Sequence, residues 1–361
     1  MTNTTLLDDV AHFTQLFGPS GHEDLVIAEF TARVRALGFE PTVDPLGNVV
    51  VRAREADAGW PTFGVAAHLD EIGFVVADVE DDGRVRVNRL GGVSDKVMAG
   101  QLVRFRSDSG ELVEGHVAVK SAHLSTPEEQ AATTKVEDAH VDLLLSSPDE
   151  AEKLAIRPGV PGTFVGPFHQ RGDLIRTKAL DDRAGLALLL DLLRRVADLP
   201  AGPGVCVIAT VQEEYTLRGG VPAALAAAPD VLLCVDISPA TDPAQRDRGG
   251  PRVGAGPVVH RFSRGRSGGG LVPNPRLAAY VTEVAAAHDI PLSHHTLDGG
   301  LTDGSYMQFA GKGIQTLDLT FPVYNAHTAV EVASVTDIAL LADLLDATVR
   351  DARSGLTFAR G

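Results

Sequence analysis

The chain has 361 residues and a formal net charge of −16 at pH 7. That length points to two domains, because single hydrophobic cores stop growing at roughly 250 to 300 residues. The negative charge disfavours nucleic acid and anionic membranes as partners, since every phosphate contact would be made against a repulsive field. A hydrophobic content of 44% with 22% charged residues is typical of a soluble globular protein, and no apolar run approaches the roughly 20 residues of a membrane helix.

Neither the start of the chain nor its cysteines indicate export. The opening MTNTTLLDDVAHF has no basic region and no apolar core, so it does not predict a signal peptide. Cys206 and Cys234 each lie in a predicted buried strand and form no CxxC pair. We therefore expect a cytoplasmic protein in which both cysteines are reduced core thiols.

Residues 1–72 predict a helix followed by two strands. Ser20 and Glu23 have the spacing of a capping box ahead of the amphipathic stretch at 25–39. The two strands are predicted within residues 43–53 and at 62–70, and the second is almost wholly apolar until its last residues. Such a run is typical of a strand that is buried on both faces.

The texture of the sequence changes at residues 73–168, where short alternating runs are broken by Gly, Asp and Ser. This pattern is typical of a small antiparallel barrel or sandwich. Helix and strand patterns alternate again over residues 169–361, which predicts a mostly parallel sheet flanked by helices. We therefore expect one α/β domain, built from residues 1–72 and 169–361, with a small β-barrel domain inserted into it.

The later part of the chain is expected to contain the following elements: a helix at 180–199, a strand at 204–211, a short helix at 219–228, a strand at 231–238, a helix at 275–288, a strand pair around 313–321 and a helix at 335–350. Residues 239–275 are rich in Pro, Gly, Arg and Ser and predict loop around one strand at 256–262. The basic stretch from Arg261 to Arg266 favours a solvated loop, with a clamp for acidic substrate side chains as the alternative.

Three of the predicted buried strands end in acidic or imidazole side chains. The first delivers His68 and Asp70, the second Glu213 and Glu214, and the third Asp236. Because the carboxyl ends of parallel strands open onto one crevice, we expect these groups to converge. Carboxylates crowded into a mostly buried crevice repel one another unless cations neutralise them. The pattern therefore indicates a metal site.

Two further segments fit a metal site at this edge. Asp181 and Asp182 stand at the start of a predicted helix, and His327 follows a β-like run. Mixed imidazole and carboxylate ligands suit zinc, cobalt or manganese. Each residue taken alone has a structural alternative: His68 as a hydrogen-bonded core histidine, Asp236 as a turn residue, and either adjacent aspartate as a helix N-cap.

Six segments carry a resemblance to a known family: AAHLDEIG, KALDDRAG, VQEEYTLRGG, VDIS, LTDG and YNAHTAVE. In this order and at these distances they resemble the tetrahedral aminopeptidases, also called glutamyl or deblocking aminopeptidases, a family of dinuclear metallopeptidases. The likeness runs over nearly the whole chain, from PSGHEDLV onward, and includes KSAHLSTPEEQ in the inserted domain. It implies an enzyme that removes N-terminal residues from short peptides.

The resemblance implies two divalent ions per subunit, zinc in the first place and cobalt or manganese as alternatives, and five ligands: His68, Asp181, Glu214, Asp236 and His327. One ion would be held by His68, Asp181 and Asp236, and the other by Asp181, Glu214 and His327, with Asp181 as the bridge. Glu213 would be the general base, and Asp70 would orient His68 through its second ring nitrogen. Asp182 is expected to cap a helix or support a ligand.

The chain departs from the family pattern at three places. Tyr215 and Thr216 stand where a Val-Gly turn is usual, Thr328-Ala329 replaces Ser-Pro, and Gly304 replaces the alanine of a Thr-Asp-Ala segment. None of these changes removes an expected ligand. A β-branched residue in place of glycine would be costly if the backbone there needed a positive φ. The shape of the substrate pocket, and with it the preferred N-terminal residue, stays open.

The resemblance also implies a homo-oligomer: a dimer formed through the inserted domain, and a hollow tetrahedral dodecamer of six such dimers. Two other functions remain as alternatives, a cellulase-like glycoside hydrolase that uses paired carboxylates and a catalytically silent scaffold of the same fold. His294, His295 and Asp298 imitate a metal cluster but are expected in a loop or near the site as polar groups. The remaining histidines are expected to be structural or at the surface: His116, His123, His140, His169, His260 and His288.

Overall fold

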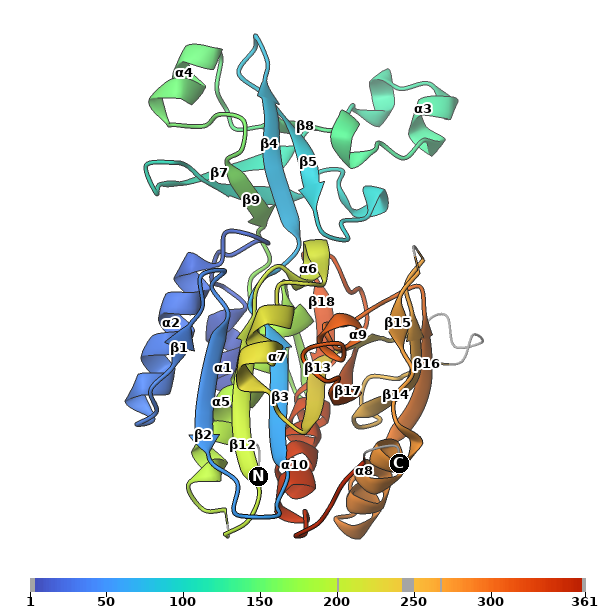
Figure 1. The fold of residues 1–361 in the computed structure, drawn as a ribbon. Helices are drawn as coiled ribbons and strands as arrows, with labels where there is room; N and C mark the ends of the chain where they lie inside the picture. The colour runs from blue at the N-terminus through green and yellow to red at the C-terminus, as the bar shows by residue number, and fades with distance from the viewer. Residues whose placement is uncertain (1–3, 200, 242–249, 267, 359–361) are drawn as a thin grey trace.

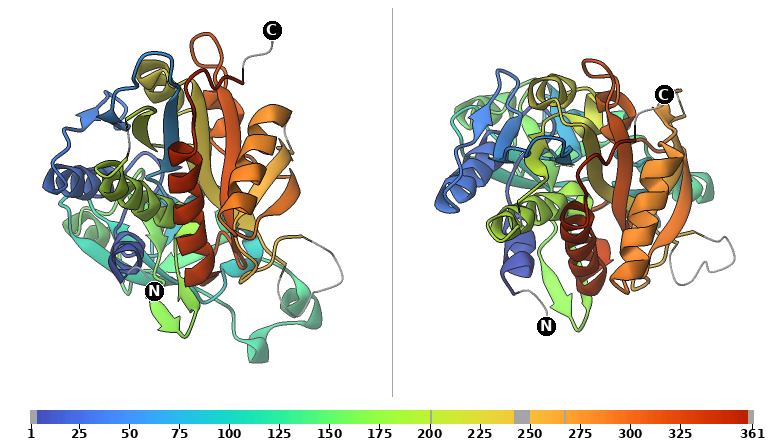
Figure 2. Two further views of the ribbon diagram at one scale, coloured as in Figure 1. Left: turned by 90° about the horizontal axis from the view of Figure 1, so that it is seen from below. Right: turned by 60° about the horizontal axis from the view of Figure 1, so that its bottom comes forward.

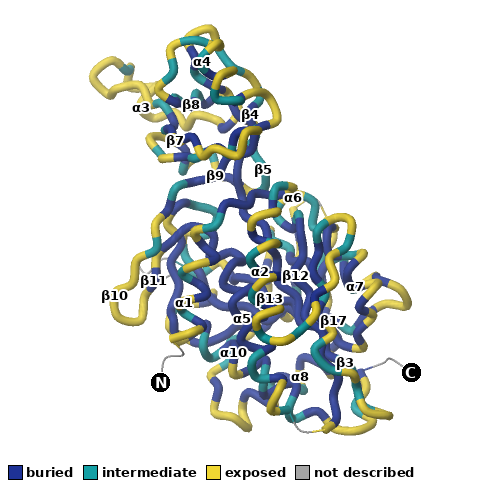
Figure 3. The backbone as a smooth tube through the Cα atoms, turned by 90° about the vertical axis from the view of Figure 1, so that its left-hand side faces the viewer, coloured by how far each residue is buried: buried dark blue, intermediate teal, exposed yellow. Residues whose placement is uncertain are grey.

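The computed structural model describes residues 4–199, 201–241, 250–266 and 268–358. It consists of a larger α/β body and a smaller β-barrel that stands on it, connected by a narrow neck (Figure 1, Figure 3). The sheet of the body is dark with buried residues, whereas the outer loops of the barrel are mostly exposed (Figure 3). The fold class expected from the sequence, a mixed α/β sheet with flanking helices and a small β-barrel, is confirmed.

A nine-stranded mixed sheet forms the centre of the body among the described residues. Its strands, in spatial order, are β1 (Thr42–Val43), β2 (Val49–Arg54), β12 (Gly204–Thr210), β3 (Thr62–His68), β13 (Val231–Pro239), β17 (Gln315–Val323), β14 (Val258–Arg264) and β15 (Gly270–Leu271), with β16 (Ser293–Asp298) paired to β14. The four central strands β12, β3, β13 and β17 are parallel, and β2 and β14 flank them in antiparallel orientation. The carboxyl ends of the four central strands therefore all lie along the same edge of the sheet, the one that runs across the strand ends.

The central strands are apolar along their whole length because helices cover both faces of the sheet. Along β12, Val205 and Val207 pack into the large core on one face, whereas Cys206 and Ile208 pack into a smaller core on the other. Side chains of a strand alternate between the two faces, so a strand buried on both sides carries no polar period.

The large core is covered by α1 (Thr4–Phe13), α2 (Asp24–Ala36), α5 (Leu180–Val196), α8 (Pro275–Ala287) and α10 (Val335–Arg350). Figure 2 shows α5, α10 and α8 side by side along this face of the sheet. The opposite face is covered by shorter helices, α7 (Val221–Ala227) and α9 (Gly304–Met307). The one-turn helix α6 (Glu213–Thr216) follows β12 at the edge where the central strands end.

The barrel domain is a closed barrel of six strands with a hydrophobic core of its own. Its strands, in spatial order, are β4 (Gly73–Val79), β5 (Val85–Leu90), β8 (His140–Asp142), β7 (Leu112–Val117), β6 (Leu102–Arg106) and β9 (Pro161–Phe164). Its connections contain η1 (Asp95–Val97), η2 (Ala122–Leu124), α3 (Pro127–Ala131), η3 (Val136–Asp138) and α4 (Pro148–Lys153). The chain returns to the body through a small sheet of β10 (His169–Arg171), β11 (Leu174–Thr177) and β18 (Glu331–Ser334).

Several local expectations were wrong. The segment expected to form a strand pair is the single strand β17. Residues 293–298 form the edge strand β16, whereas a loop, or polar groups near the site, was expected there. Helix α1 was not predicted at all, because only its Leu6, Val10 and Phe13 face the core in a stretch of mixed polarity. Part of the expected loop at 239–275, residues 242–249 and 267, lies outside the described residues.

The expected capping box at the start of α2 was also wrong. Glu23 occupies the N-cap position, but its side chain makes no cap hydrogen bond to α2. Its carboxylate accepts hydrogen bonds from the backbone N–H groups of Gly21 and Gln212, and the Ser20 hydroxyl donates to Asp70 at 2.5 Å. The side chains of Ser20 and Glu23, which the spacing predicted to cap α2, therefore bond to residues far away in the sequence.

Both cysteines are free and buried. Burial raises the pKa of the Cys206 thiol to about 12 and holds that of Cys234 well above its ordinary value. Both side chains belong to the smaller core, where they pack as small apolar groups. In the parts of the chain that the structure describes, no helix has both the length and the apolar character that crossing a bilayer requires.

Candidate active site

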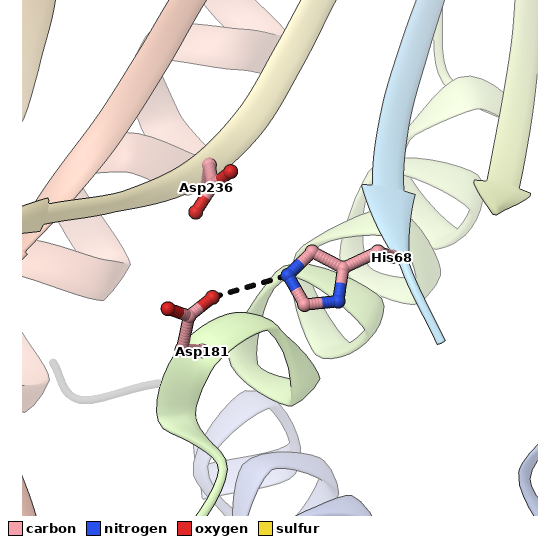
Figure 4. A group of neighbouring side chains, drawn as sticks. All are labelled: His68, Asp181 and Asp236. Carbon is pink, nitrogen blue, oxygen red and sulfur yellow. Dashed lines mark hydrogen bonds and ion pairs between the residues drawn. The ribbon is translucent and has the colours of Figure 1, made fainter. Parts of the chain in front are cut away.

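The parallel strands bring the expected site residues to one edge of the sheet. In the register of β3 and β12, His68 lies opposite Thr210, so the residues that follow Thr210 emerge beside His68. On the other side, β13 runs parallel to β3 and carries Asp236 near its end. Figure 4 shows His68 from β3, Asp181 from the start of α5 and Asp236 from β13 pointing toward one another.

Two groups of ligand-type side chains share Asp181. The first ligand group is His68, Asp181 and Asp236, and the second ligand group is Asp181, Glu214 and His327. Within each group, one nitrogen or oxygen atom per residue lies within 4.8 Å of the others. The two carboxylate oxygens of Asp181 divide between the groups: Oδ1 is 3.1 Å from His68 Nε2, and Oδ2 is 3.3 Å from His327 Nε2.

Asp181 is held in place by a residue that the sequence did not single out. The carboxylate of Glu331 accepts hydrogen bonds from the backbone N–H of Asp181 at 3.1 Å and of His327 at 2.8 Å. Glu331 is buried at the start of β18, and burial together with the charge of Asp181 raises its pKa to about 8. The sequence feature that could have indicated Glu331 is its position as the last residue of the segment YNAHTAVE, four residues after His327.

His68 presents Nε2 to Asp181 because its other ring nitrogen is occupied. Nδ1 lies 3.1 Å from the backbone oxygen of Asp70 and 3.4 Å from the Asp70 carboxylate. A ring nitrogen that is bound in this way fixes both the orientation and the tautomer of the imidazole. Burial opposes ionisation of Asp70, but its hydrogen bonds with His68 and Ser20 lower its pKa below the ordinary value.

The Asp70 carboxylate also anchors α6. Its two oxygens accept the backbone N–H groups of Glu213 at 3.0 Å and Glu214 at 3.1 Å. These are the first two residues of a four-residue helix, so their N–H groups have no partner within the helix itself. One side chain thus orients an imidazole and fixes the turn that carries two acidic residues.

Glu213 lies at the site but belongs to neither ligand group. Its side chain is buried, and its Oε1 has no hydrogen-bond partner in the described structure. Burial raises the pKa of Glu213 well above its ordinary value, and the nearby carboxylates of Asp236 and Asp303 add to that shift. Asp303, in the LTDG segment, accepts the Thr210 hydroxyl and was not expected among the site residues.

Negative charge dominates the electrostatics of this pocket. Burial raises the pKa of Glu214 to about 7 and that of Asp236 well above its ordinary value. The carboxylate of Glu214 raises the pKa of His327, and hydrogen bonds to Asp181 and Asp70 raise that of His68 against the effect of burial. Burial therefore raises the pKa values of Glu214 and Asp236, whereas hydrogen bonds from His327 and His68 hold the pKa of Asp181 below its ordinary value against the effect of burial.

Asp182 caps the helix that follows it. One of its oxygens accepts the backbone N–H of Gly185 at 3.1 Å, and its other oxygen is buried with no hydrogen-bond partner among the described residues. The peptide bond between Asp181 and Asp182 is cis. Asp182 lies outside both ligand groups, in agreement with the expected capping role.

The departures from the family pattern fit their surroundings. Tyr215 and Thr216 lie within helix α6, and the positive φ values of this turn fall at Gln212 and Leu217, so no glycine is needed at Thr216. At Gly304, a Cβ atom would lie 2.6 Å from Asp318 Oδ1 and 3.2 Å from Cys234 Sγ. Glycine avoids that clash.

His294, His295 and Asp298, which imitate a metal cluster in the sequence, are separate from the site. They lie on the edge strand β16, where the Asp298 carboxylate pairs with Arg264 on the neighbouring strand β14. His260 is buried beside β13 and shares a hydrogen bond of 2.7 Å with the Ser238 hydroxyl. The other histidines expected to be structural also lie outside both ligand groups: His116, His123, His140, His169 and His288.

Sequence reasoning also missed a buried ion network beneath the site. Glu71 pairs with Lys178 at 2.6 Å and with Arg183 at 3.4 Å, and it accepts the hydroxyl of Thr163 from the barrel strand β9 at 2.8 Å. Arg183 is fully buried and donates to the backbone oxygens of Phe13 and Gly18. Glu71 lies in the segment AAHLDEIG, and Lys178 and Arg183 lie in KALDDRAG, close to the expected ligands. No local pattern in the sequence indicated that these residues pair.

Known aminopeptidases are similar to this chain over most of its length. The curated lysyl aminopeptidase of Pyrococcus furiosus is 31% identical over 325 residues, which cover 89% of this chain and 90% of the relative. The solved aminopeptidase of Desulfurococcus kamchatkensis has a TM-score of 0.89 and 30% identity, covering 97% of this chain and 96% of that one. A structure of the Pyrococcus horikoshii TET1 peptidase, described as assembling into a tetrahedron or a large octahedral shell, has a TM-score of 0.83 and 26% identity, covering 96% and 99%.

The family assignment rests on a match over most of the chain. The model of the M42 glutamyl aminopeptidase family matches residues 47–344, which span β2, the whole barrel domain and the residues of both ligand groups. The resemblance seen in the sequence is thereby confirmed. The chain belongs to the M42 glutamyl aminopeptidase family and is a peptide hydrolase.

Proposed function

We propose that the chain is a dinuclear metal-dependent aminopeptidase that removes N-terminal residues from short peptides, with Glu213 as the general base. The observation that carries this proposal is the position of Asp181, whose two oxygens face two separate ligand groups. In the proposal each ligand group holds one divalent ion and Asp181 bridges them. Glu213, which belongs to neither group, is free to handle protons.

The residues present fit two divalent ions. Each ligand group offers imidazole nitrogen and carboxylate oxygen, the donors that suit zinc first and cobalt or manganese as well. One carboxylate oxygen each of Glu213 and Glu214 is buried and has no hydrogen-bond partner in the part of the chain that the structure describes. Ionised carboxylates in such a place are costly unless cations neutralise them. Three protein ligands per ion leave coordination positions for water and substrate, which closed structural sites lack.

Such a pair of ions would polarise the peptide carbonyl and lower the pKa of a water molecule toward roughly 7. The side chains of the protein supply the rest of the reaction. Glu213 accepts the proton of the attacking water and passes it to the departing amine, so that one carboxylate serves as base and then as acid. Asp70 keeps the Nε2 atom of His68 directed into the site and holds the helix that carries Glu213.

The two alternative functions fit these observations less well. A glycoside hydrolase needs two carboxyl groups across the sugar and no transition metal, and sugar clefts usually carry aromatic platforms. The chain has one Trp, and Trp60 lies next to Gly202 at the start of β12, at the opposite end of the strand from the site. A silent scaffold gives no reason for the buried, unpartnered carboxylate of Glu213.

The first test is a panel of chromogenic aminoacyl substrates, assayed before chelation, after chelation, and after zinc, cobalt or manganese is restored. We expect hydrolysis that chelation abolishes and at least one of these metals restores. The substrate with the highest kcat/KM would identify the preferred N-terminal residue. Activity that survives complete removal of metal, or hydrolysis of cellulose oligomers alone, would refute the proposal.

Chelated protein should become less stable as the pH rises. The folded-state pKa values of Glu214, about 7, and Glu331, about 8, exceed their ordinary value of 4.5, so the folded state holds protons that the unfolded state has released. His68 and His327, whose pKa values are also raised, act in the same direction. The free energy of unfolding therefore falls between about pH 5 and pH 8.

Calorimetry of the chelated protein at pH 6 and pH 8 measures this effect. We expect a lower Tm at pH 8, by several degrees, since about 1 kcal/mol corresponds to roughly 2–4 °C in a domain of this size. The gain in Tm on adding zinc should be larger at pH 8, because the ligands must be deprotonated to bind it. A metal-free Tm that rises from pH 6 to pH 8 would contradict the assigned electrostatics.

Replacement of the general base should separate catalysis from metal binding. Glu213→Gln keeps the shape of the side chain and removes the proton acceptor, so kcat should fall by about 10²- to 10⁴-fold. Its metal content, measured by elemental analysis after dialysis, should match that of the parent. The adjacent Glu214→Gln is the contrast, because it should lose metal as well as activity. Loss of metal from Glu213→Gln with normal turnover per bound metal would refute the assignment.

We further propose that the protein forms dimers through the barrel domain and a tetrahedral dodecamer of six dimers. The barrel exposes apolar side chains, which favour an interface between protein surfaces: Leu102, Leu112, Val119, Leu124 and Leu144. The TET1 peptidase is a relative that assembles into closed shells. In such a shell only short or unfolded peptides would reach the sites.

Light scattering tests this assembly. We expect a mass of twelve times that of the 38.0 kDa chain for the dodecamer, and of two times that of the chain for an isolated dimer. Leu144→Glu places a charge on the most exposed of these apolar positions and should shift the population toward smaller species, whereas a change on the body, Leu225→Glu, should not. A parent protein whose light-scattering mass is that of a monomer at micromolar concentration would exclude the shell.

A further inference from the structure

Three consecutive backbone N–H groups precede or begin the helix that carries Glu213, and each donates to a carboxylate. The N–H of Gln212 donates to Glu23 Oε1 at 3.0 Å, and those of Glu213 and Glu214 donate to the two oxygens of Asp70 at 3.0 and 3.1 Å. Gln212 has a left-handed conformation, with φ of 58° and ψ of 31°. The chain thus turns sharply from β12 into α6 at a point held by two acidic side chains.

Glu23 reaches this turn from the loop between α1 and α2, far away in sequence. The same Oε1 atom accepts the backbone N–H of Gly21 at 2.8 Å, and the side chain is buried. From this loop the Ser20 hydroxyl also donates to Asp70. The loop therefore touches the turn twice, directly through Glu23 and indirectly through Ser20 and Asp70.

The loop is itself fixed to the body. The buried Arg183 donates to the backbone oxygen of Gly18 at 3.0 Å, and the backbone N–H of Glu71 donates to the same oxygen at 3.2 Å. The Glu71 carboxylate in turn accepts the Gly18 N–H. Glu23 is accordingly presented from a loop with several anchors of its own, so its bond to Gln212 can act on the turn.

The hydrogen bonding of Glu23 argues against a simple role in helix α2. It stands at the N-cap position of that helix but makes no cap hydrogen bond to it. The acceptor oxygen is used instead by Gly21 and Gln212. Removing that oxygen leaves the half-buried N–H of Gln212 without this acceptor and releases the residue on which the position of Glu213 depends.

We infer that Glu23 is a positioning residue for catalysis, which holds the peptide before Glu213 so that the Glu213 carboxylate faces the bound water. The inference rests on the proposed role of Glu213 as general base. Glu23 belongs to neither ligand group, and its hydrogen bond toward the site is the one that it accepts from the backbone N–H of Gln212. Its contribution is the hydrogen-bond acceptor, which a glutamine side chain also provides at the same reach.

The test compares three substitutions of the full-length, metal-loaded enzyme: Glu23→Ala, Glu23→Asp and Glu23→Gln. Alanine removes the acceptor, and aspartate keeps the charge but is one methylene too short. Both should lower kcat by about 10- to 100-fold, the cost of a general base misplaced by about 1 Å, with KM and metal content within about twofold of the parent. Glutamine should keep kcat within about twofold of the parent.

A matched control separates positioning from general stability. The buried side chain of Asn274 accepts the backbone N–H of Arg276 and so caps α8. It also donates to Gln315 at the start of β17, which lies at the opposite end of the strands from the site. Asn274→Ala should lower Tm but leave kcat within about twofold. If Glu23→Ala fails to fold, the pair of Glu23→Asp and Glu23→Gln still gives the comparison.

Each outcome decides the inference. A kcat of Glu23→Ala or Glu23→Asp close to that of the parent overturns it, as does a Glu23→Gln enzyme that is as impaired as Glu23→Asp. A loss of kcat that follows loss of metal also overturns it, because the residue would then support metal binding. An active Glu213→Gln enzyme would overturn the proposed function and this inference together, whereas an inactive one beside a fully active Glu23→Ala enzyme would overturn the inference alone.

Discussion

Uncompensated negative charge at the carboxyl ends of β3, β12 and β13 is the constraint on which this structure depends. The sheet brings buried carboxylates from distant parts of the chain into one pocket, where the pKa values of Glu213 and Asp236 rise because water is excluded and like charges lie close together. Among the residues that the structure describes, two imidazoles, those of His68 and His327, belong to the ligand groups there. In the proposed enzyme two divalent ions supply the missing positive charge, and the energetic cost of the empty pocket becomes affinity for the metal.

Several of these carboxylates serve a second purpose, since they hold backbone in place. Glu331 joins the N–H groups of Asp181 and His327, and Asp70 joins those of Glu213 and Glu214. Glu331 thus joins two residues of the second ligand group, and Asp70 joins Glu214 of that group to the adjacent Glu213. The geometry of the site is therefore set by hydrogen bonds to main chain, which do not change with the identity of the side chains that line the substrate pocket.

The ion network of Glu71, Lys178 and Arg183 connects the pocket to its surroundings. Glu71 directly follows Asp70, and Arg183 lies two residues after Asp181, so the network is built from residues next to those of the site. Through Thr163 the network also reaches the base of the barrel. The neck between the domains is thus tied to the same residues that flank the proposed metal ligands.

The sequence by itself determined the features that follow from its pattern of apolar and polar residues. Apolar runs predicted the central strands, alternation predicted the barrel, and the acidic strand ends predicted where the site would lie, because the ends of parallel strands must meet at one edge. The family resemblance supplied the roles of His68, Asp181, Glu214, Asp236 and His327. What only the tertiary structure decided was the pairing of groups far apart in the chain: Ser20 with Asp70, Glu23 with Gln212, Glu331 with Asp181, and Glu71 with Lys178. A hydrogen-bonding side chain carries no mark of its partner in the local sequence, so spacing that suits a capping box can be overruled by a stronger partner that folding brings within reach.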